Sequence, residues 1–381
     1  MLNWVEIDAA ALRHNLGVFR ERLGSGPLLG AVVKSNAYGH GAAPVAALAT
    51  RFGADWLCVN HVDEGLALRA EGHQVPILVM GYTPGDRLRD LVRNDLRPVL
   101  YDLAPIERLA EVAAADGQTV PIHLKVETGT HRQGIPASEV VAIATRIRDL
   151  QGVRLEGLSS HFANIEDTTD HGYALRQLET YRSIDAQLRD ADLAAPIRHT
   201  ACSAAALLLE STHLELARVG IGMYGVWPSR ETLVSCRELF ETEIELHPVM
   251  SWKTRIAQIR DVPEGEFVGY GCTYRTTRAS RIAVLPIGYH EGYRRSLSGV
   301  AHVLIAGRRA PLRGRICMNM SMVDVSDIPA LSTDDEVVLL GRQGDDRITV
   351  EQLSEWSGTI PYEFLTGIHS SLPRVVVNDL P

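Results

Sequence analysis

The chain has 381 residues, of which 45% are hydrophobic and 22% charged, so it is long enough for two or three domains and ordinary for a soluble globular protein. Its formal net charge of −9 argues against nucleic acid as the main partner. The five cysteines are scattered and form no C-x-x-C pair, which favours a reduced, cytoplasmic chain over a disulfide framework or a zinc site. We find no signal peptide and no apolar run long enough to span a membrane.

The first part of the chain alternates short apolar runs with amphipathic segments. Asp8 is placed to cap a helix whose apolar residues, from Leu12 to Leu23, recur at helical spacing. The predicted strands are Leu29–Val33, Trp56–Val59, Pro76–Met80, Arg97–Leu100, Val120–Val126, Val153–Ser159, Ile197–Ala201 and Leu216–Val219. The amphipathic segments between them include Gly41–Phe52, Pro105–Ala115, Glu139–Leu150 and Tyr173–Leu188.

Strand followed by helix, repeated along the chain, implies parallel strands joined by right-handed crossovers. Eight such units within about 230 residues fit a closed (β/α)8 barrel, which typically takes ~250 residues. We therefore predict an α/β fold with a TIM barrel over residues 1–238. A doubly wound open sheet is the alternative, although nothing in the sequence marks a reversal of strand order.

After residue 238 the pattern changes to strands punctuated by turn residues, which predicts a second, mostly β domain over residues 239–381. Its predicted strands are His247–Ile259, Arg281–Pro286, Val300–Ile305, Met320–Val325 and Glu336–Leu340, with a turn at Pro263–Gly265 and one helix at Thr349–Ser357.

In a barrel enzyme the reacting residues gather past the carboxyl ends of the strands. Lys34 directly follows the apolar run Gly30–Val33. Partial desolvation there would lower its pKa and leave a nucleophilic amine able to form a Schiff base. The simpler reading is a lysine that extends from a strand end into water.

The loops after the seventh and eighth strands are where barrels often bind phosphate. Ser203, Gly220 and Ile221 occupy these two loops, although Ser203 could be only a helix cap and Gly220 only a turn residue. Arg218, at the edge of the eighth strand, would point at an anion or an acceptor nitrogen. In the second domain, Tyr270 lies between two glycines, which marks either a bulge or a tyrosine that removes a proton with the help of nearby cations.

Taken together, these segments resemble the alanine racemase family over essentially the whole chain. The matching segments are Val33–Gly41, His123–Gly129, His161–Ala163, His199–Ala205, Arg218–Gly225, Gly269–Gly271, Leu285–Tyr289, Gly314–Met318 and Thr359–Glu363, in the order in which the family has them.

The resemblance implies a pyridoxal-phosphate barrel with a C-terminal β domain, working as a homodimer on a small amino acid. Lys34 would carry the cofactor as a Schiff base and act as the base for D-alanine. Tyr270, reaching in from the partner subunit, would be the base for L-alanine. The phosphate would be held by Tyr38, Ser203, Gly220, Ile221 and Tyr362.

The resemblance also implies that Arg218 faces the pyridine nitrogen and that His161 supports both Arg218 and Tyr270. Arg132 and the backbone of Met318 would bind the substrate carboxylate. Lys125 aligns with a lysine that is carbamylated in many members. No metal is implied.

Four positions depart from the family pattern: Cys202 stands where asparagine is common, and the other three leave other reactions open. Thr130 and His131 replace a Met-Gly pair, and Asn319 replaces an aspartate, which motivates a serine or broad-spectrum racemase as an alternative. A decarboxylase would carry an acidic residue in place of Arg218, and a non-catalytic carrier of the single-barrel type would lack Tyr270. A sugar-phosphate barrel enzyme, which needs no Schiff base, is the alternative from another class.

Overall fold

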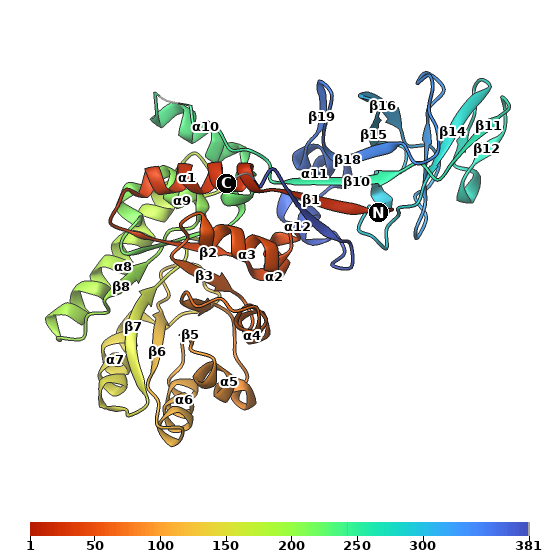
Figure 1. Cartoon of the computed structure of the whole chain (residues 1–381). Helices are drawn as coiled ribbons and strands as arrows, with labels where there is room; N and C mark the ends of the chain where they lie inside the picture. The colour runs from red at the N-terminus through yellow and green to blue at the C-terminus, as the bar shows by residue number, and fades with distance from the viewer. Residues whose placement is uncertain (242, 380–381) are drawn as a thin grey trace. The chain divides into compact units, whose positions relative to one another are not determined.

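The computed structural model describes residues 1–241 and 243–379, which form two compact units (Figure 1). The barrel unit comprises Leu12–Ala37 and Val45–His247. The β unit comprises Met1–Ala11, Tyr38–Pro44 and Pro248–Pro381. We describe each unit separately.

The barrel unit is built on an eight-stranded parallel sheet in the order β8-β7-β6-β5-β4-β3-β2-β9. Its strands are β2 (Leu28–Val32), β3 (Trp56–Val59), β4 (Ile77–Val79), β5 (Leu96–Leu100), β6 (Val120–Lys125), β7 (Val153–Ser159), β8 (Ile197–His199) and β9 (Leu216–Val219). The two ends of this path meet, because the Glu215 N–H bonds to the Arg198 carbonyl at 3.2 Å and the Arg218 N–H to the Ala201 carbonyl at 3.1 Å. The predicted barrel is confirmed, and the open sheet is wrong.

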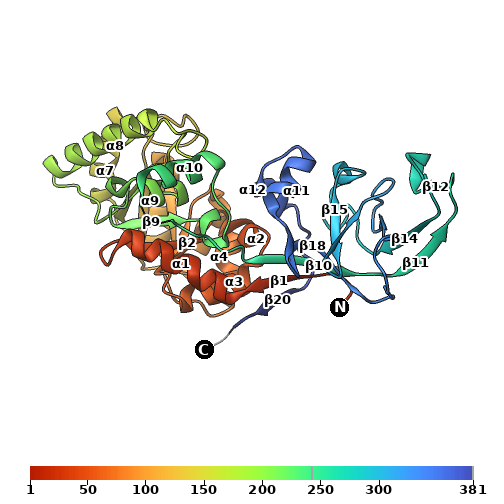
Figure 2. The same ribbon diagram turned by 90° about the horizontal axis from the view of Figure 1, so that it is seen from above.

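Helices follow the strands around this barrel (Figure 2). They are α1 (Ala9–Leu23), α3 (Ala42–Arg51), α4 (Val62–Ala70), α5 (Leu88–Arg93), α6 (Leu103–Ala115), α7 (Val140–Asp149), α8 (Gly172–Asp190), α9 (Ser203–Leu208) and α10 (Arg230–Leu239), with a short helical turn α2 (Lys34–Tyr38). Asp8 caps α1 as predicted, since its Oδ1 accepts the Ala11 N–H at 2.9 Å. Leu12, Leu16 and Phe19 are fully buried, as their helical spacing predicts.

The β unit is organised by a seven-stranded sheet in which β1 (Trp4–Asp8) lies between β10 (Met250–Arg255) and β20 (Arg374–Val377). β1 runs antiparallel to β10 and parallel to β20. Sequence reasoning did not assign this strand, because its partners lie at the other end of the chain. The boundary after residue 238 stays a prediction.

One predicted strand of the β unit is wrong. The run His247–Ile259 is divided between β10 and β11 (Gln258–Val262), which belong to different sheets. The chain changes sheets at the two residues between them. The Ile256 N–H bonds to the Asp335 carbonyl at 3.1 Å, whereas the Ala257 N–H bonds to the Val284 carbonyl at 2.9 Å.

The remaining predicted elements of the β unit are present within three residues of their expected ends, the largest difference being at β18, which extends past Leu340 to Gln343. Its other strands and helices are β12 (Phe267–Val268), β13 (Tyr274–Arg275), β14 (Ser280–Leu285), β15 (His302–Ile305), β16 (Arg308–Pro311), β17 (Ser321–Asp324), β18 (Glu336–Gln343), β19 (Asp346–Ile348), α11 (Val350–Ser357) and α12 (Pro361–Thr366). Thr349 caps α11 with its side chain and makes a capping box with Gln352.

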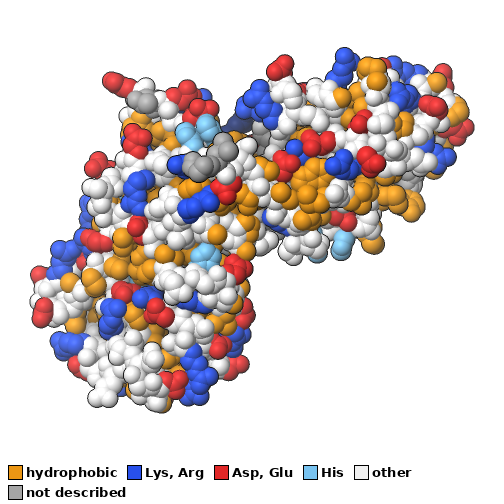
Figure 3. Space-filling model, viewed as in Figure 1, with side chains coloured by type: hydrophobic (Ala, Val, Ile, Leu, Met, Phe, Trp, Pro, Cys, Tyr) orange, Lys and Arg blue, Asp and Glu red, His pale blue; other side chains and the backbone are white. Residues whose placement is uncertain are grey.

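None of the helices in the described residues has the length and hydrophobicity that crossing a bilayer requires. On the face drawn in Figure 3, acidic and basic side chains are interspersed over both units.

The central position of β1 makes a stability prediction. Ile7 is fully buried in this strand, so Ile7→Ala should lower the free energy of unfolding of the β unit by roughly 2–5 kcal/mol through lost burial and the cavity left behind. Leu2→Ala, at a side chain that is 56% exposed, is the matched control and should change stability little. Urea unfolding followed by tryptophan fluorescence measures both, and equal midpoints would contradict the role given to β1.

Candidate active site

The carboxyl end of β2 leads into an unusual backbone turn. Ser35, Asn36 and Ala37 have φ of 55, 54 and 52° and ψ of 50, 45 and 52°, and Tyr38 follows with φ 52°. None of these is glycine, and the left-handed helical conformation costs other residues roughly 1–2 kcal/mol each. Such strain persists where surrounding contacts enforce it, typically at functional sites.

Glu64 of α4 supplies contacts that hold this turn. Its Oε1 accepts the Ser35 N–H at 2.6 Å, and its Oε2 accepts the N–H groups of Asn60 and His61 at 2.7 and 3.0 Å. The carboxylate thus ties the turn that carries Lys34 to the end of the neighbouring strand β3. Sequence reasoning missed Glu64, although the spacing His61-x-x-Glu64 is that of a capping box.

Lys34 is half-buried at the start of this turn. Burial lowers the pKa of its amine, and the positive charge of Arg132 lowers it further, while Glu64 partly opposes the shift. The amine is therefore easier to deprotonate than an ordinary lysine, which is the condition for attacking a carbonyl carbon.

Several cations predicted for the site come together in the barrel unit. Burial lowers the pKa of Lys125 to about 8, helped by the charges of Arg132, Arg218 and Lys34. Burial also lowers the pKa of His161 to about 3, and the same cations add to that shift. We call Lys34, Lys125, Arg132 and Arg218, together with the neutral imidazole of His161, the cationic cluster.

Arg218, on β9, is only 8% exposed. Its Nη1 bonds to the Nδ1 and, at 2.9 Å, to the carbonyl oxygen of His199. Its Nη2 donates to the carbonyls of Ser160 at 2.8 Å and Thr200 at 3.3 Å. The four N–H groups of the terminal nitrogens thus match four protein acceptors, and Nε–H is the fifth donor of the guanidinium. Within the described residues, no carboxylate bonds to Arg218.

Ser203 and Gly220, predicted for the phosphate loops, lie against each other. The Ser203 Oγ accepts the Gly220 N–H at 2.9 Å and the Gly222 N–H at 3.3 Å. A Cβ added at Gly222 would lie 2.4 Å from the Phe19 ring, so glycine is required there for close packing on α1. The loops after β8 and β9 therefore bring a hydroxyl and backbone N–H groups to one place.

The loop that carries Arg132 follows β6 and is ordered by Glu127. The Glu127 Oε1 accepts the N–H groups of Gly129 and Thr130 at 2.5 and 2.7 Å. The Thr130 hydroxyl donates to the His161 carbonyl at 2.7 Å, and His131 has φ 52°. Two family departures, Thr130 and His131, are thus accommodated in the backbone of this loop.

The candidates in the β unit are arranged differently. The rings of Tyr38 and Tyr362 lie 6.1 Å apart, so these two predicted phosphate ligands are brought together. Tyr270 and Met318 are 73% and 56% exposed. Asn319 donates to the Glu291 Oε1 at 2.6 Å, so a carboxylate lies beside the position where the family has an aspartate.

Sequence reasoning also missed three buried side chains that are linked to Arg218 by hydrogen bonds. His199 bonds to His123, which bonds to Glu156, and all three lie on barrel strands. Both histidines stand in the motifs quoted above, but a histidine inside a strand is ordinarily only a buried polar residue. The signal that could have revealed them is the placement of two histidines and a glutamate on three neighbouring strands.

Models of the two alanine racemase domains match this chain, the N-terminal domain over residues 7–228 and the C-terminal domain over residues 249–376. The chain belongs to the alanine racemase family. It is 40% identical to an alanine racemase from Desulfovibrio desulfuricans over 98% of each chain.

Solved structures of the family have the same fold. That of alanine racemase from Clostridium difficile 630 superposes with a TM-score of 0.93 at 33% identity, over 99% of this chain and 96% of the other. A histidine racemase from Leuconostoc mesenteroides superposes with a TM-score of 0.89 at 26% identity, over 98% of each chain. The architecture is thus shared by racemases named for different amino acids.

The electrostatics of the cationic cluster make a titration prediction. Because burial and nearby cations favour the neutral ring, His161 should stay uncharged down to about pH 4 and gain a proton only near its pKa of about 3. Nitrogen NMR of protein labelled in histidine measures this, with His161→Gln to assign the signal. Titration of that signal near pH 6.5 would contradict the described environment.

Proposed function

We propose that this protein interconverts L-alanine and D-alanine with pyridoxal 5′-phosphate attached to Lys34. The observation that carries the proposal is a half-buried lysine with a lowered pKa, on a strained turn at the carboxyl end of a barrel strand, within the same cationic cluster as Arg218. Membership of the alanine racemase family supports the reaction, and the residues described above support the roles that we propose in it.

The lysines of the chain support Lys34 as the attachment point. There are three, Lys34, Lys125 and Lys253. Lys253 bonds to Glu6 at 3.0 Å and Glu336 at 3.2 Å. Burial acts to lower its pKa, but these two carboxylates outweigh burial and raise it, so its amine stays protonated. Only Lys34 and Lys125 have lowered pKa values, and only Lys34 begins a loop directly after an apolar strand.

The groups present fit the proposed cofactor. The hydroxyls of Ser203, Tyr38 and Tyr362 and the Ile221 N–H would donate to a phosphate, while the Gly220 N–H bonds to the Ser203 Oγ and positions that hydroxyl. The four N–H groups of the Arg218 terminal nitrogens bond to protein acceptors, so Nε–H would be the donor to a ring nitrogen. Burial lowers the pKa of Arg218, but a guanidinium remains protonated in proteins. When bound, the cofactor draws electron density from the α-carbon and so acidifies its proton.

Two bases on opposite faces then exchange the α-proton. Lys34 serves the D-enantiomer and Tyr270 the L-enantiomer, with His161 supporting Arg218 and Tyr270. Because the Tyr270 side chain is 73% exposed in a single chain, we propose that it completes the site of a partner subunit in a homodimer. The exposed apolar side chains Phe267, Tyr289, Met318 and Met320 of the same unit would be covered by that partner.

Arg132 and the backbone of Met318 would bind the substrate carboxylate. A pKa of about 8 leaves part of the Lys125 amine neutral near physiological pH, so it can add carbon dioxide and become a carbamate. The resulting anion would pair with Arg132, with the Gln133 side chain, 3.5 Å from the Lys125 Nζ, beside it. Without this modification, Lys125 and Arg132 are two cations that repel each other.

A racemase with broader substrates is the second candidate, because Thr130 and His131 add bulk near Arg132. The Asn319 departure is less consequential, since Glu291 keeps a carboxylate beside it. A decarboxylase is disfavoured by Arg218. We also propose a cytoplasmic location, in keeping with the five free cysteines.

Lys34→Ala should abolish covalent attachment of the cofactor. Wild-type protein incubated with pyridoxal phosphate and reduced with borohydride should carry a pyridoxyl group on the peptide that contains Lys34, as read by mass spectrometry. Lys253→Ala is the matched control and should be labelled like the wild type. Label on Lys125, or no label at all, would overturn the assignment.

Tyr270→Phe should slow removal of the α-proton of L-alanine at least about a hundredfold, the lower range for losing a general base, and that of D-alanine far less. Exchange of the α-proton with deuterium oxide, followed for each enantiomer, measures the asymmetry. Tyr274→Phe removes a hydroxyl from the same unit and should exchange like the wild type. Equal slowing of both enantiomers by Tyr270→Phe would disprove the two-base assignment.

A further inference from the structure

A chain of four side chains runs through the barrel interior from Arg218 to Glu156. Arg218 bonds to the Nδ1 of His199. The Nε2 of His199 lies 2.7 Å from the Nδ1 of His123, and the Nε2 of His123 lies 3.3 Å from the Glu156 Oε2. The two imidazoles are 1% and 0% exposed. We call Arg218, His199, His123 and Glu156 the relay.

The hydrogen bonds of the relay all point in one direction. A guanidinium only donates, so the Nδ1 of His199 accepts and its Nε2 carries the proton. That proton goes to the Nδ1 of His123, whose Nε2–H donates to the Glu156 carboxylate, which only accepts. If His123 were protonated, its Nδ1 would donate to the Nε2 of His199, and the His199 proton would have to lie on Nδ1. That Nδ1–H would then face an N–H of Arg218, so two donors would oppose each other. Both rings are therefore neutral Nε2–H tautomers, and burial together with the charge of Arg218 lowers the pKa of each.

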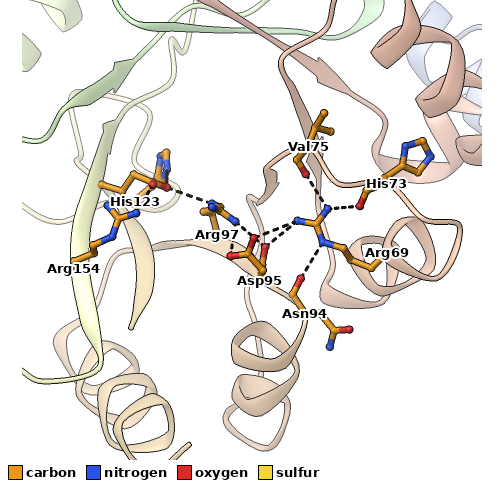
Figure 4. Close-up of polar contacts among 9 residues, drawn as sticks. Arg69, His73, Val75, Asn94, Asp95, Arg97, His123 and Arg154 are labelled. Atoms are coloured by element: carbon orange, nitrogen blue, oxygen red, sulfur yellow. Dashed lines mark hydrogen bonds and ion pairs between the residues drawn. The ribbon is translucent and has the colours of Figure 1, made fainter. Parts of the chain in front are cut away.

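Glu156 is fixed as an anion at the other end of the relay. Its Oε1 lies 2.9 Å from the Arg154 Nη2, and its Oε2 lies 3.5 Å from the Arg97 Nε. Burial acts to raise the pKa of Glu156, but the bond from His123 and the charges of Arg97 and Arg154 outweigh it and lower the pKa overall. Figure 4 shows Arg97 and Arg154 converging beside His123, with Asp95 linking Arg97 to Arg69.

The relay bears on how the buried positive charge of Arg218 is stabilised. A buried cation without a counter-charge is strongly destabilised, yet Arg218 has only neutral acceptors in contact with it. At the far end of the relay, the Glu156 carboxylate is joined to Arg218 through two rings whose dipoles are aligned between the opposite charges. A carboxylate directly against Arg218 would instead add negative charge beside a bound ring nitrogen and favour its protonation.

We propose that His199, His123 and Glu156 are positioning residues that hold Arg218 as a cation whose Nε–H faces the ring nitrogen, and that they thereby suppress transamination in favour of racemisation. The proposal rests on the proposed function. It assigns reaction specificity to a carboxylate that lies two side chains away from Arg218. In the suppressed side reaction, alanine gives its amino group to the cofactor, yielding pyruvate and pyridoxamine phosphate.

The test is Glu156→Gln, which keeps the size and an acceptor oxygen but removes the charge. Removal of the Glu156 charge should make it easier for Arg218 to pass a proton to the ring nitrogen, on the order of tenfold. We therefore expect the holoenzyme to form about ten times more pyridoxamine phosphate per racemisation event than the wild type does. Glu215→Gln is the matched control: Glu215 is also a barrel carboxylate paired with an arginine, Arg198, but it bonds to no histidine. An unchanged ratio in Glu156→Gln would overturn the proposal.

A second measurement needs neither cofactor nor a stable variant. Nitrogen NMR of the histidine-labelled, cofactor-free wild type should show His199 and His123 as neutral Nε2–H tautomers, and an Nδ1–H tautomer at either ring would refute the relay. Where Glu156→Gln folds, the His123 Nε2 proton should move upfield, because an amide oxygen is a weaker acceptor than a carboxylate. If the wild type neither binds pyridoxal phosphate nor racemises alanine, the proposed function fails, while these signals still decide whether the relay exists.

Discussion

A positive charge buried among neutral acceptors is the constraint on which the rest of the site depends. Arg218 is enclosed by carbonyl oxygens and one imidazole nitrogen, and a path of hydrogen bonds leads from it through His199 and His123 to the Glu156 carboxylate. Arranging these groups requires strands β6, β7, β8 and β9 to lie side by side, which barrel closure provides. The position of the guanidinium is therefore a property of the whole barrel.

The positive charge of Arg218 also affects the pKa values of neighbouring groups. Burial lowers the pKa of Lys125 and His161, and Arg218 adds to both shifts. It also acts to lower the pKa of Cys58 and Cys202, but burial dominates there and raises both to about 12, so these thiols stay protonated and inert. A site that lowers the pKa of its amines and keeps its imidazoles uncharged is suited to moving protons at one carbon atom.

Much of the barrel could be predicted from the sequence, because each buried parallel strand is a short apolar run and each helix shows a periodic apolar face. The strand β1 could not be predicted, because these five residues at the start of the chain form a strand only by pairing with β10 and β20. The division of His247–Ile259 was missed because apolar alternation continues through Ile256 and Ala257, where the backbone changes sheets.

The candidate site was predicted to a different degree at each residue. Lys34, Ser203 and Gly220 could be predicted because they follow strands whose ends the sequence marks, and Arg218 because it lies at the edge of the last of these strands. The left-handed turn at Ser35–Tyr38 contains no glycine, so the local sequence does not predict it. The turn is held by Glu64, which lies in α4. The relay could not be predicted, because tautomers and hydrogen-bond directions are defined only once the four strands that carry it lie side by side.

The measurement that tests the central claim most directly is incubation of the purified holoenzyme with L-alanine alone, followed by chiral analysis of the alanine that remains. A racemase will carry the reaction to an equal mixture of the enantiomers, and the absorbance of the bound cofactor, at ~420 nm, will be retained throughout. L-alanine that stays unchanged, or that is lost as pyruvate while the absorbance disappears, would contradict the proposed function.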